Sequence, residues 1–236
     1  MEGNFCSHCG QKSSIGRITV ANFLQEVSES VFQINRGFFY TLRELFVQPG
    51  NSIHEFLQGK RKKHFKPIAY LIVLSTVYFL IAQITDQNTW LGDIITGWMR
   101  GATEQDANAD LPEIASWFLI NYAYATLLLL PVFSLASYLS FFPFGKTYLE
   151  HIVINSYITG QQAIFYTLFI LGNTVIDSEV MEALPVFIAF FYNVWVYWQL
   201  FPQGNRAGNI LRSILTYILY LIFSVVFLGI LMAFSG

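Results

Sequence analysis

Residues 213–234 read SILTYILYLIFSVVFLGILMAF, a stretch without a single Asp, Glu, Lys or Arg. A helix of about 20 mainly apolar residues is long enough to cross the hydrocarbon core of a bilayer, which is roughly 30 Å thick. A helix can cross because it satisfies its own backbone hydrogen bonds, whereas a lone apolar strand leaves them unpaired in lipid. This stretch therefore predicts a transmembrane helix.

Four more uncharged stretches precede it and give five predicted spans in all, at about 68–84, 117–139, 152–176, 184–201 and 213–234. The composition agrees with this count, since 54% of the 236 residues are hydrophobic and only 12% are charged, against about 25% charged in soluble domains. The fold class is predicted as all-α, a polytopic membrane protein with five transmembrane helices (67–236) and a small cytoplasmic helical N-terminal region.

Basic residues predict the orientation, because short loops rich in Lys and Arg tend to stay in the cytoplasm. In the five-span arrangement 12 of the 13 Lys and Arg residues fall on the side of the N-terminus, and only Arg100 falls on the other. Nine of the 15 acidic residues fall on the side of Arg100. We therefore expect a cytoplasmic N-terminus and an external C-terminus.

Residues 1–16 are predicted to form half of a zinc-knuckle-like site. Cys6 and Cys9 are separated by two residues and followed by Gly10, a spacing typical of a metal-binding turn. Zinc is the natural ion, but a structural zinc site takes four protein ligands and the chain has only two cysteines. Completion by a histidine, sharing between two copies of the chain, and a knuckle that binds no metal all stay open.

Residues 17–66 are predicted to form cytoplasmic amphipathic and interfacial helices that lie on the inner leaflet. Apolar residues recur at helical spacing over 20–34, and again over 38–46, where Arg36 and Arg43 favour a membrane surface. Pro49-Gly50 predicts a break in the chain. Ser52 to Glu55 has the spacing of a capping box, and Gly59 is placed to end a short helix.

A basic anchor lies directly before the first span, and its cations are Lys60, Arg61, Lys62, Lys63 and Lys66. Each cation near an anionic leaflet contributes about 1 kcal/mol to lipid association. Membrane lipids are therefore expected partners, with fixation of the topology as the simpler role of this segment. Nucleic acid is not an expected partner, because the cluster is short and lies at the membrane.

The predicted spans contain amides but no formally charged side chain. The intramembrane polar candidates are Asn121, Asn155, Gln162 and Asn193. Interhelical hydrogen bonding is the simpler interpretation of these amides, and a path for a neutral solute is the alternative. Asn155, Thr159 and Gln162 share one face of the third predicted span, so we expect that face to point into the bundle.

The sequence does not predict an enzyme. Intramembrane hydrolysis needs a nucleophile and base, a carboxylate pair or a metal-bound water, and no motif for any of these is recognisable. Glu150 and His151 are the only adjacent acid and imidazole. Because they lie at the inner end of the third predicted span, we interpret them as a solvated helix boundary, and no catalytic residue is assigned.

Several ordered motifs resemble an uncharacterised family of bacterial integral membrane proteins, best represented in Bacteroidota and described as a domain of unknown function. The motifs are Cys6-Ser7-His8-Cys9-Gly10-Gln11, Arg17-Ile18-Thr19, Thr41-Leu42, Pro49-Gly50, and Gly59-Lys60-Arg61 followed by Pro67. The resemblance covers roughly residues 5–85 and implies location in a bacterial cytoplasmic (inner) membrane. Family members often carry an earlier cysteine pair that completes a four-cysteine zinc ribbon, and this chain shows only one pair.

A weaker likeness links the chain to Yip1-type five-span membrane proteins, through the number of spans and the region 195–212. It implies a scaffold-like or trafficking role. Our leading hypothesis is a non-enzymatic membrane scaffold or regulatory component that binds another protein, or a second copy of the chain, through its N-terminal region. The alternative is a transporter or channel for a neutral solute or lipid.

Overall fold

The computed structural model describes residues 36–103, 113–176 and 178–235, and all regular elements within these ranges are helical. The predicted half-site 1–16, with Cys6 and Cys9, lies outside the described residues, as does the predicted amphipathic segment 20–34. The α-helices are α2 (Arg36–Val47), α3 (Pro49–Leu57), α4 (Pro67–Ile84), α5 (Trp90–Thr103), α6 (Glu113–Ile120), α7 (Tyr122–Ser140), α8 (Tyr148–Asn173), α9 (Glu179–Leu200) and α10 (Arg206–Ser235), with a 3₁₀ turn η1 (Phe142–Phe144) before α8.

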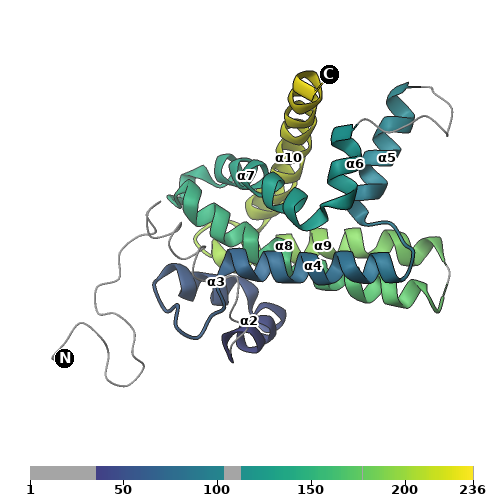
Figure 1. Ribbon diagram of the computed structural model, residues 1–236. Coiled ribbons are helices and arrows are strands. Elements are labelled where there is room, and N and C mark those ends of the chain that lie inside the picture. The colour runs from purple at the N-terminus through teal and green to yellow at the C-terminus, as the bar shows by residue number, and fades with distance from the viewer. Residues whose placement is uncertain (1–35, 104–112, 177, 236) are drawn as a thin grey trace, which may run out of the picture.

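The long helix α8 lies at the centre of the molecule, in contact with α4, α7, α9 and the shorter α2 and α3 (Figure 1). α4 runs in the same direction as α8, because Tyr70 meets Gln161 near one end and Gln87 meets Ile170 near the other. α7 and α9 run in the opposite direction. The connecting loops of these four helices therefore lie at two opposite ends of the bundle.

Four helical segments are long and apolar enough to cross a membrane: 67–84, 122–140, 183–200 and 206–231. They overlap the predicted spans 68–84, 117–139, 184–201 and 213–234. The third predicted span, 152–176, falls on α8, which has 26 residues but is not among the four. The amides of Asn155, Gln161 and Gln162 make α8 more polar than its neighbours, and its central position removes those amides from lipid.

The predicted segment 117–139 is divided in the structure. α6 ends at Ile120 and α7 begins at Tyr122, while Asn121 has φ −110° and ψ 46° and is not helical. Its Nδ2 donates to the carbonyl of Trp117 at 3.1 Å. An asparagine side chain that bonds to nearby backbone competes with the helical ladder, which explains a break at this residue. The chain also forms α5, a helix that the sequence analysis did not predict.

On α10 the exposed residues are mostly apolar and the buried residues are polar, the opposite of an amphipathic helix in a soluble protein. Over 206–231 its buried residues are all polar: Asn209, Ser213 and Thr216, which lie on one face. Large apolar side chains such as Leu211 and Leu221 are two-thirds exposed. In Figure 1 most of α10 projects beyond the layer formed by α4, α8 and α9. Apolar residues outside and polar residues inside are expected of a helix that faces lipid.

Gly160 sets the distance between α8 and α4. A Cβ atom at this position would lie 2.6 Å from the Tyr70 ring and 3.3 Å from the Cα of Leu71. Such contacts are too short for any side chain, so the two helices can approach this closely only because residue 160 is glycine. Tyr70 and Leu71 are fully buried at this crossing.

We expect Gly160→Ala to lower the free energy of unfolding by about 1–3 kcal/mol, the usual cost of overpacking a close contact. Gly229→Ala is the matched control, because a Cβ atom on Gly229 of α10 would meet nothing within 4 Å. Thermal unfolding of the two purified variants in the same detergent tests this. Equal melting temperatures for the two variants would contradict the assigned crossing.

Candidate functional site

Asn155 of α8 joins three helices in the interior of the bundle. Its Nδ2 donates to Ser137 Oγ of α7 at 2.7 Å, and its Oδ1 accepts a hydrogen bond from the Tyr197 hydroxyl of α9 at 2.8 Å. All three side chains are essentially inaccessible to solvent. A buried amide with both ends paired fixes the rotation and register of the helices that it connects.

His151 belongs to the same network, one turn before Asn155 on α8. Its Nδ1 lies 2.9 Å from Ser137 Oγ, and its ring stacks against Phe201. A serine beside an imidazole is the geometry of an activated nucleophile. Here, however, both side chains are fully buried and Ser137 Oγ is already bonded to Asn155. The pair therefore connects α7 to α8 inside the bundle.

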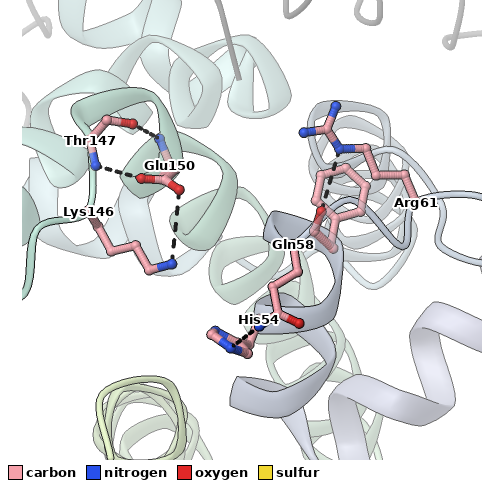
Figure 2. A network of polar contacts seen from close by, with 7 residues as sticks. His54, Gln58, Arg61, Lys146, Thr147 and Glu150 are labelled. Atoms are coloured by element: carbon pink, nitrogen blue, oxygen red, sulfur yellow. Dashed lines mark hydrogen bonds and ion pairs between the residues drawn. The ribbon is translucent and has the colours of Figure 1, made fainter. Parts of the chain in front are cut away.

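The interpretation of Glu150 and His151 as a solvated boundary is wrong, because both are buried. Glu150 forms a capping box with Thr147: the Glu150 amide donates to Thr147 Oγ1, and the Thr147 amide donates to Glu150 Oε2. Lys146 Nζ lies 3.9 Å from the other carboxylate oxygen (Figure 2). The carboxylate thus satisfies backbone donors at the start of α8, where the helix dipole favours negative charge.

The other predicted intramembrane polar residues lie in different surroundings. Gln162 Nε2 donates to the Ala189 carbonyl at 3.0 Å and lies 3.4 Å from the Tyr217 hydroxyl, so it connects α8 to α9 and α10. Asn193 is fully buried on α9, close in sequence to Tyr197. Asn121 is partly exposed at the break between α6 and α7 and does not join the interior network.

Some interior polar atoms have no hydrogen-bond partner within the described ranges. They are His151 Nε2, Gln161 Nε2 and both amide atoms of Asn193. An unpaired buried polar atom costs about 1–3 kcal/mol, so such atoms tend to bind ordered water or a ligand. They are the features of the interior that a path for a neutral solute would use.

Sequence analysis missed Ser134, Ser137, His151 and Tyr197 as members of the network. Ser134, Ser137 and Ser140 fall at intervals of three residues and all three are buried, and Ser134 and Ser137 contact α8. Small hydroxyl residues at this spacing mark a close helix contact in membrane proteins. That spacing was a usable signal, whereas nothing in the sequence pairs Tyr197 with Asn155.

The α2–α3 pair, residues 36–57, is fixed to the bundle rather than separate from it. The Gly50 amide donates to Gln199 Oε1 of α9 at 2.9 Å, and a Cβ atom on Gly50 would lie 2.3 Å from the Gln199 Cβ and 2.7 Å from the backbone of α9. The Tyr192 hydroxyl donates to the Leu45 carbonyl at 3.0 Å. The backbone of the α2–α3 pair thus lies directly against α9.

Helix boundaries in this pair agree in part with those expected. The predicted break lies directly before Pro49, because α2 ends at Val47 and Gln48 is not helical; Pro49 then begins α3, where a proline lacks no needed hydrogen bond. Ser52 is buried inside α3 and does not cap it. Gly59 follows the helix with φ 98°, a conformation that favours glycine and ends the helix as predicted.

The basic anchor 60–66 begins where α3 ends. Lys60 Nζ forms an ion pair with Glu55 at 2.7 Å. Arg61 (Figure 2) lies over the Phe56 ring and donates to the Phe56 carbonyl at 3.4 Å. Lys62 and Lys63 are exposed. Figure 2 also shows the contact of Gln58 with His54 on the α3 side of this region. Two cations of the anchor are therefore held against α3, and two project from the surface.

The last residues of the basic anchor connect α2 to α8 through hydrogen bonds of the Phe65 backbone. The Phe65 amide donates to Thr41 Oγ1 at 2.7 Å, and the Phe65 carbonyl accepts from the Tyr157 hydroxyl at 2.6 Å. His64 is buried edge-on between the rings of Tyr40 and Phe56. This desolvation lowers the pKa of His64, opposed by the carboxylates of Glu55 and Glu44 and assisted by Lys63 and Lys60.

No metal site can be assigned from the described part of the chain, because it brings together no group of three or more His, Cys, Asp or Glu side chains suited to a metal ion. The cysteines expected to bind zinc, Cys6 and Cys9, lie outside it. A complete site would therefore need ligands from residues 1–35 or from a second copy of the chain.

We expect Asn155→Leu to lower the free energy of unfolding by about 1–3 kcal/mol, because it removes two buried hydrogen bonds, the one to Ser137 Oγ and the one from the Tyr197 hydroxyl. Asn121→Leu is the matched control, and we expect a change within about 0.5 kcal/mol at this partly exposed position. Denaturation monitored by circular dichroism in one detergent tests both variants. An equal decrease in the free energy of unfolding of both variants would argue against the network.

The stability of the protein should fall on acidification through His64. Because burial lowers the pKa of the ring in the folded chain, the neutral ring stabilises the fold fully above its ordinary pKa of about 6.5 and less as the pH falls below it. His64→Phe keeps an aromatic ring between Tyr40 and Phe56. When the pH is lowered from about 7.5 to 5.5, its melting temperature should fall less than that of wild type. Lys62→Gln, whose exposed cation is not among the charges that shift the pKa of His64, should keep the wild-type slope, and identical slopes in all three proteins would refute the assignment.

A model of the family described as a protein of unknown function (DUF3667) matches residues 35–79. No curated protein and no solved structure matches the chain. The matched segment comprises α2, α3, the basic anchor and most of α4. It is therefore the part of the structure in which the N-terminal helices dock on the bundle, and the match is consistent with the resemblance to an uncharacterised family.

Proposed function

We propose that this protein is a non-enzymatic scaffold or regulatory component of a bacterial inner membrane, acting through its N-terminal region. The observation that carries the proposal is the attachment of the α2–α3 pair to α9 through Gly50 and Gln199. α2, the first helix that the structure describes, is thereby attached to the bundle. A protein partner, or a second copy of the chain, bound to the N-terminal region would be connected to the bundle through this helix.

Neutrality of the interior supports a non-enzymatic role. The segments 67–84, 122–140 and 183–200 contain no Asp, Glu, Lys, Arg or His. Ion-coupled carriers and intramembrane hydrolases place ionisable groups where substrate reaches them. The nearest equivalent, Ser137 with His151, is enclosed by packed aromatic rings.

Five crossings with a cytoplasmic N-terminus form part of the proposal. α8 supplies the fifth crossing: its 26 residues extend about 39 Å, and its polar face is covered by α4, α7 and α9. With five alternating crossings the basic anchor, Lys146 and Arg206 would all lie on one side of the membrane. A cytoplasmic location of that side follows from the preference of Lys and Arg for inner loops.

A zinc half-site at Cys6 and Cys9 is the proposed means of partner binding. Two thiolates leave half of a tetrahedral coordination sphere open, and a second chain could supply the rest. The bacterial family that the chain resembles often has a second cysteine pair, which supports the identity of the metal. Sharing of one ion would make binding of zinc and pairing of chains depend on each other.

Transport of a neutral solute or lipid is the second candidate, and the unpaired amide atoms of Asn193 and Gln161 favour it. Substrate flux in liposomes that Asn193→Leu abolishes, with the protein still folded, would support transport. The same result would contradict a purely scaffolding role.

Crosslinking in native membranes, followed by purification, tests the scaffold proposal. Wild type should retain a partner or a crosslinked dimer, and both Gly50→Leu and the double variant Cys6→Ser, Cys9→Ser should lose it. Gly229→Leu is the control, because the position has open space around it. About half a zinc per chain in wild type, absent from the cysteine variant, would indicate a shared site. Retention of the same partner by all four proteins would contradict the proposal.

A further inference from the structure

The two sides of α2 differ in what they contact. Leu45 is fully buried against the bundle, while on the opposite side Phe39 is 69% exposed, Val47 61% and Phe46 40%. α3 presents a different surface, since its exposed residue is Asn51 and Gln58 follows it. The α2–α3 pair therefore has an apolar outer face on α2 and a polar outer face on α3.

The apolar face lies at the depth of the membrane-spanning helices and not beyond their ends. Tyr192, which bonds to the Leu45 carbonyl, is eight residues before the end of α9 at Leu200. At 1.5 Å per residue this places the end of α2 about 12 Å along the span. The Phe46 ring also packs 5.7 Å from that of Phe165, far along α8. An outward side chain at this depth meets lipid.

Cations lie beside this apolar face. Arg43 is exposed on α2 between Phe39 and Phe46, and its long side chain can reach toward headgroups while its stem stays in the apolar layer. Lys62 and Lys63 are exposed a few residues before α4 begins at Pro67, which places them at the level of lipid phosphates. The carboxylate of Glu55 is already paired with Lys60.

We propose that the outer face of α2 is a binding surface for anionic phospholipid. Acyl chains pack on Phe39, Phe46 and Val47, and lipid phosphates face Arg43, Lys62 and Lys63. α3, with its polar outer face, lies on the aqueous side. This surface is independent of the scaffold proposal, because it uses neither the cysteines nor a protein partner.

Spin labels at Val47 and at Gln58, in a chain with Cys6→Ser and Cys9→Ser, test the lipid contact in nanodiscs. We expect the Val47 label to collide with oxygen and to be shielded from a water-soluble nickel chelate, and the Gln58 label to show the reverse. Both positions are exposed, so the labels need not disturb the fold. Equal access of nickel to both labels would overturn the proposal, and so would shielding of Val47 from both reagents, which indicates a protein cover.

Retention of phosphatidylglycerol over phosphatidylcholine, measured by native mass spectrometry, tests the charge preference. Lys62→Gln together with Lys63→Gln should weaken that preference by about fivefold for each lysine removed. Lys62→Arg together with Lys63→Arg, which keeps both charges, is the control and should leave the preference unchanged. An unchanged preference in the double lysine variant would overturn the phosphate assignment.

Discussion

Satisfaction of the polar side chains of α8 is the constraint on which the rest of the structure depends. Asn155, Gln162 and His151 could not face lipid without a large cost, because hydrocarbon supplies no hydrogen-bond partner. Neighbouring helices must therefore cover them and supply donors and acceptors, as Ser137, Tyr197 and the Ala189 carbonyl do. The positions of α7 and α9 around α8 follow from that requirement.

Close approach of backbones is the second requirement, and two glycines meet it at different sites. Gly160 lets α4 lie against α8, and Gly50 lets α3 lie against α9. In lipid the hydrophobic effect gives little preference for one helix arrangement over another, so packing and hydrogen bonds decide it. Because the Gly50 contact joins the N-terminal helices to a span, the same physics that assembles the bundle also holds the proposed binding region in place.

How well each helix could be predicted depended on what it faces. α4, α9 and α10 face lipid over much of their surface, so an unbroken apolar run in the sequence revealed them. α8 faces other helices, and its amides lower its apolar character although it is long enough to cross. The pairing of Tyr197 with Asn155 arises from a tertiary contact that no local pattern encodes. The interpretation of Glu150 as a solvated residue was wrong for a different reason: Thr147 and Glu150 have the spacing of a capping box, a local signal that is present in the sequence.

Placement of charge connects the interior to the proposed roles. The basic anchor lies beside the apolar outer face of α2. The described bundle interior contains amides, hydroxyls and the imidazole of His151, and the buried carboxylate of Glu150 lies at its edge, where α8 begins. Charges at the surface can bind lipid phosphates and leave the interior neutral. A neutral, hydrogen-bonded interior resists relative motion of its helices, because each shift would break several buried bonds at once. Such a bundle suits a fixed support for a docked N-terminal region better than a carrier that must alternate between two arrangements.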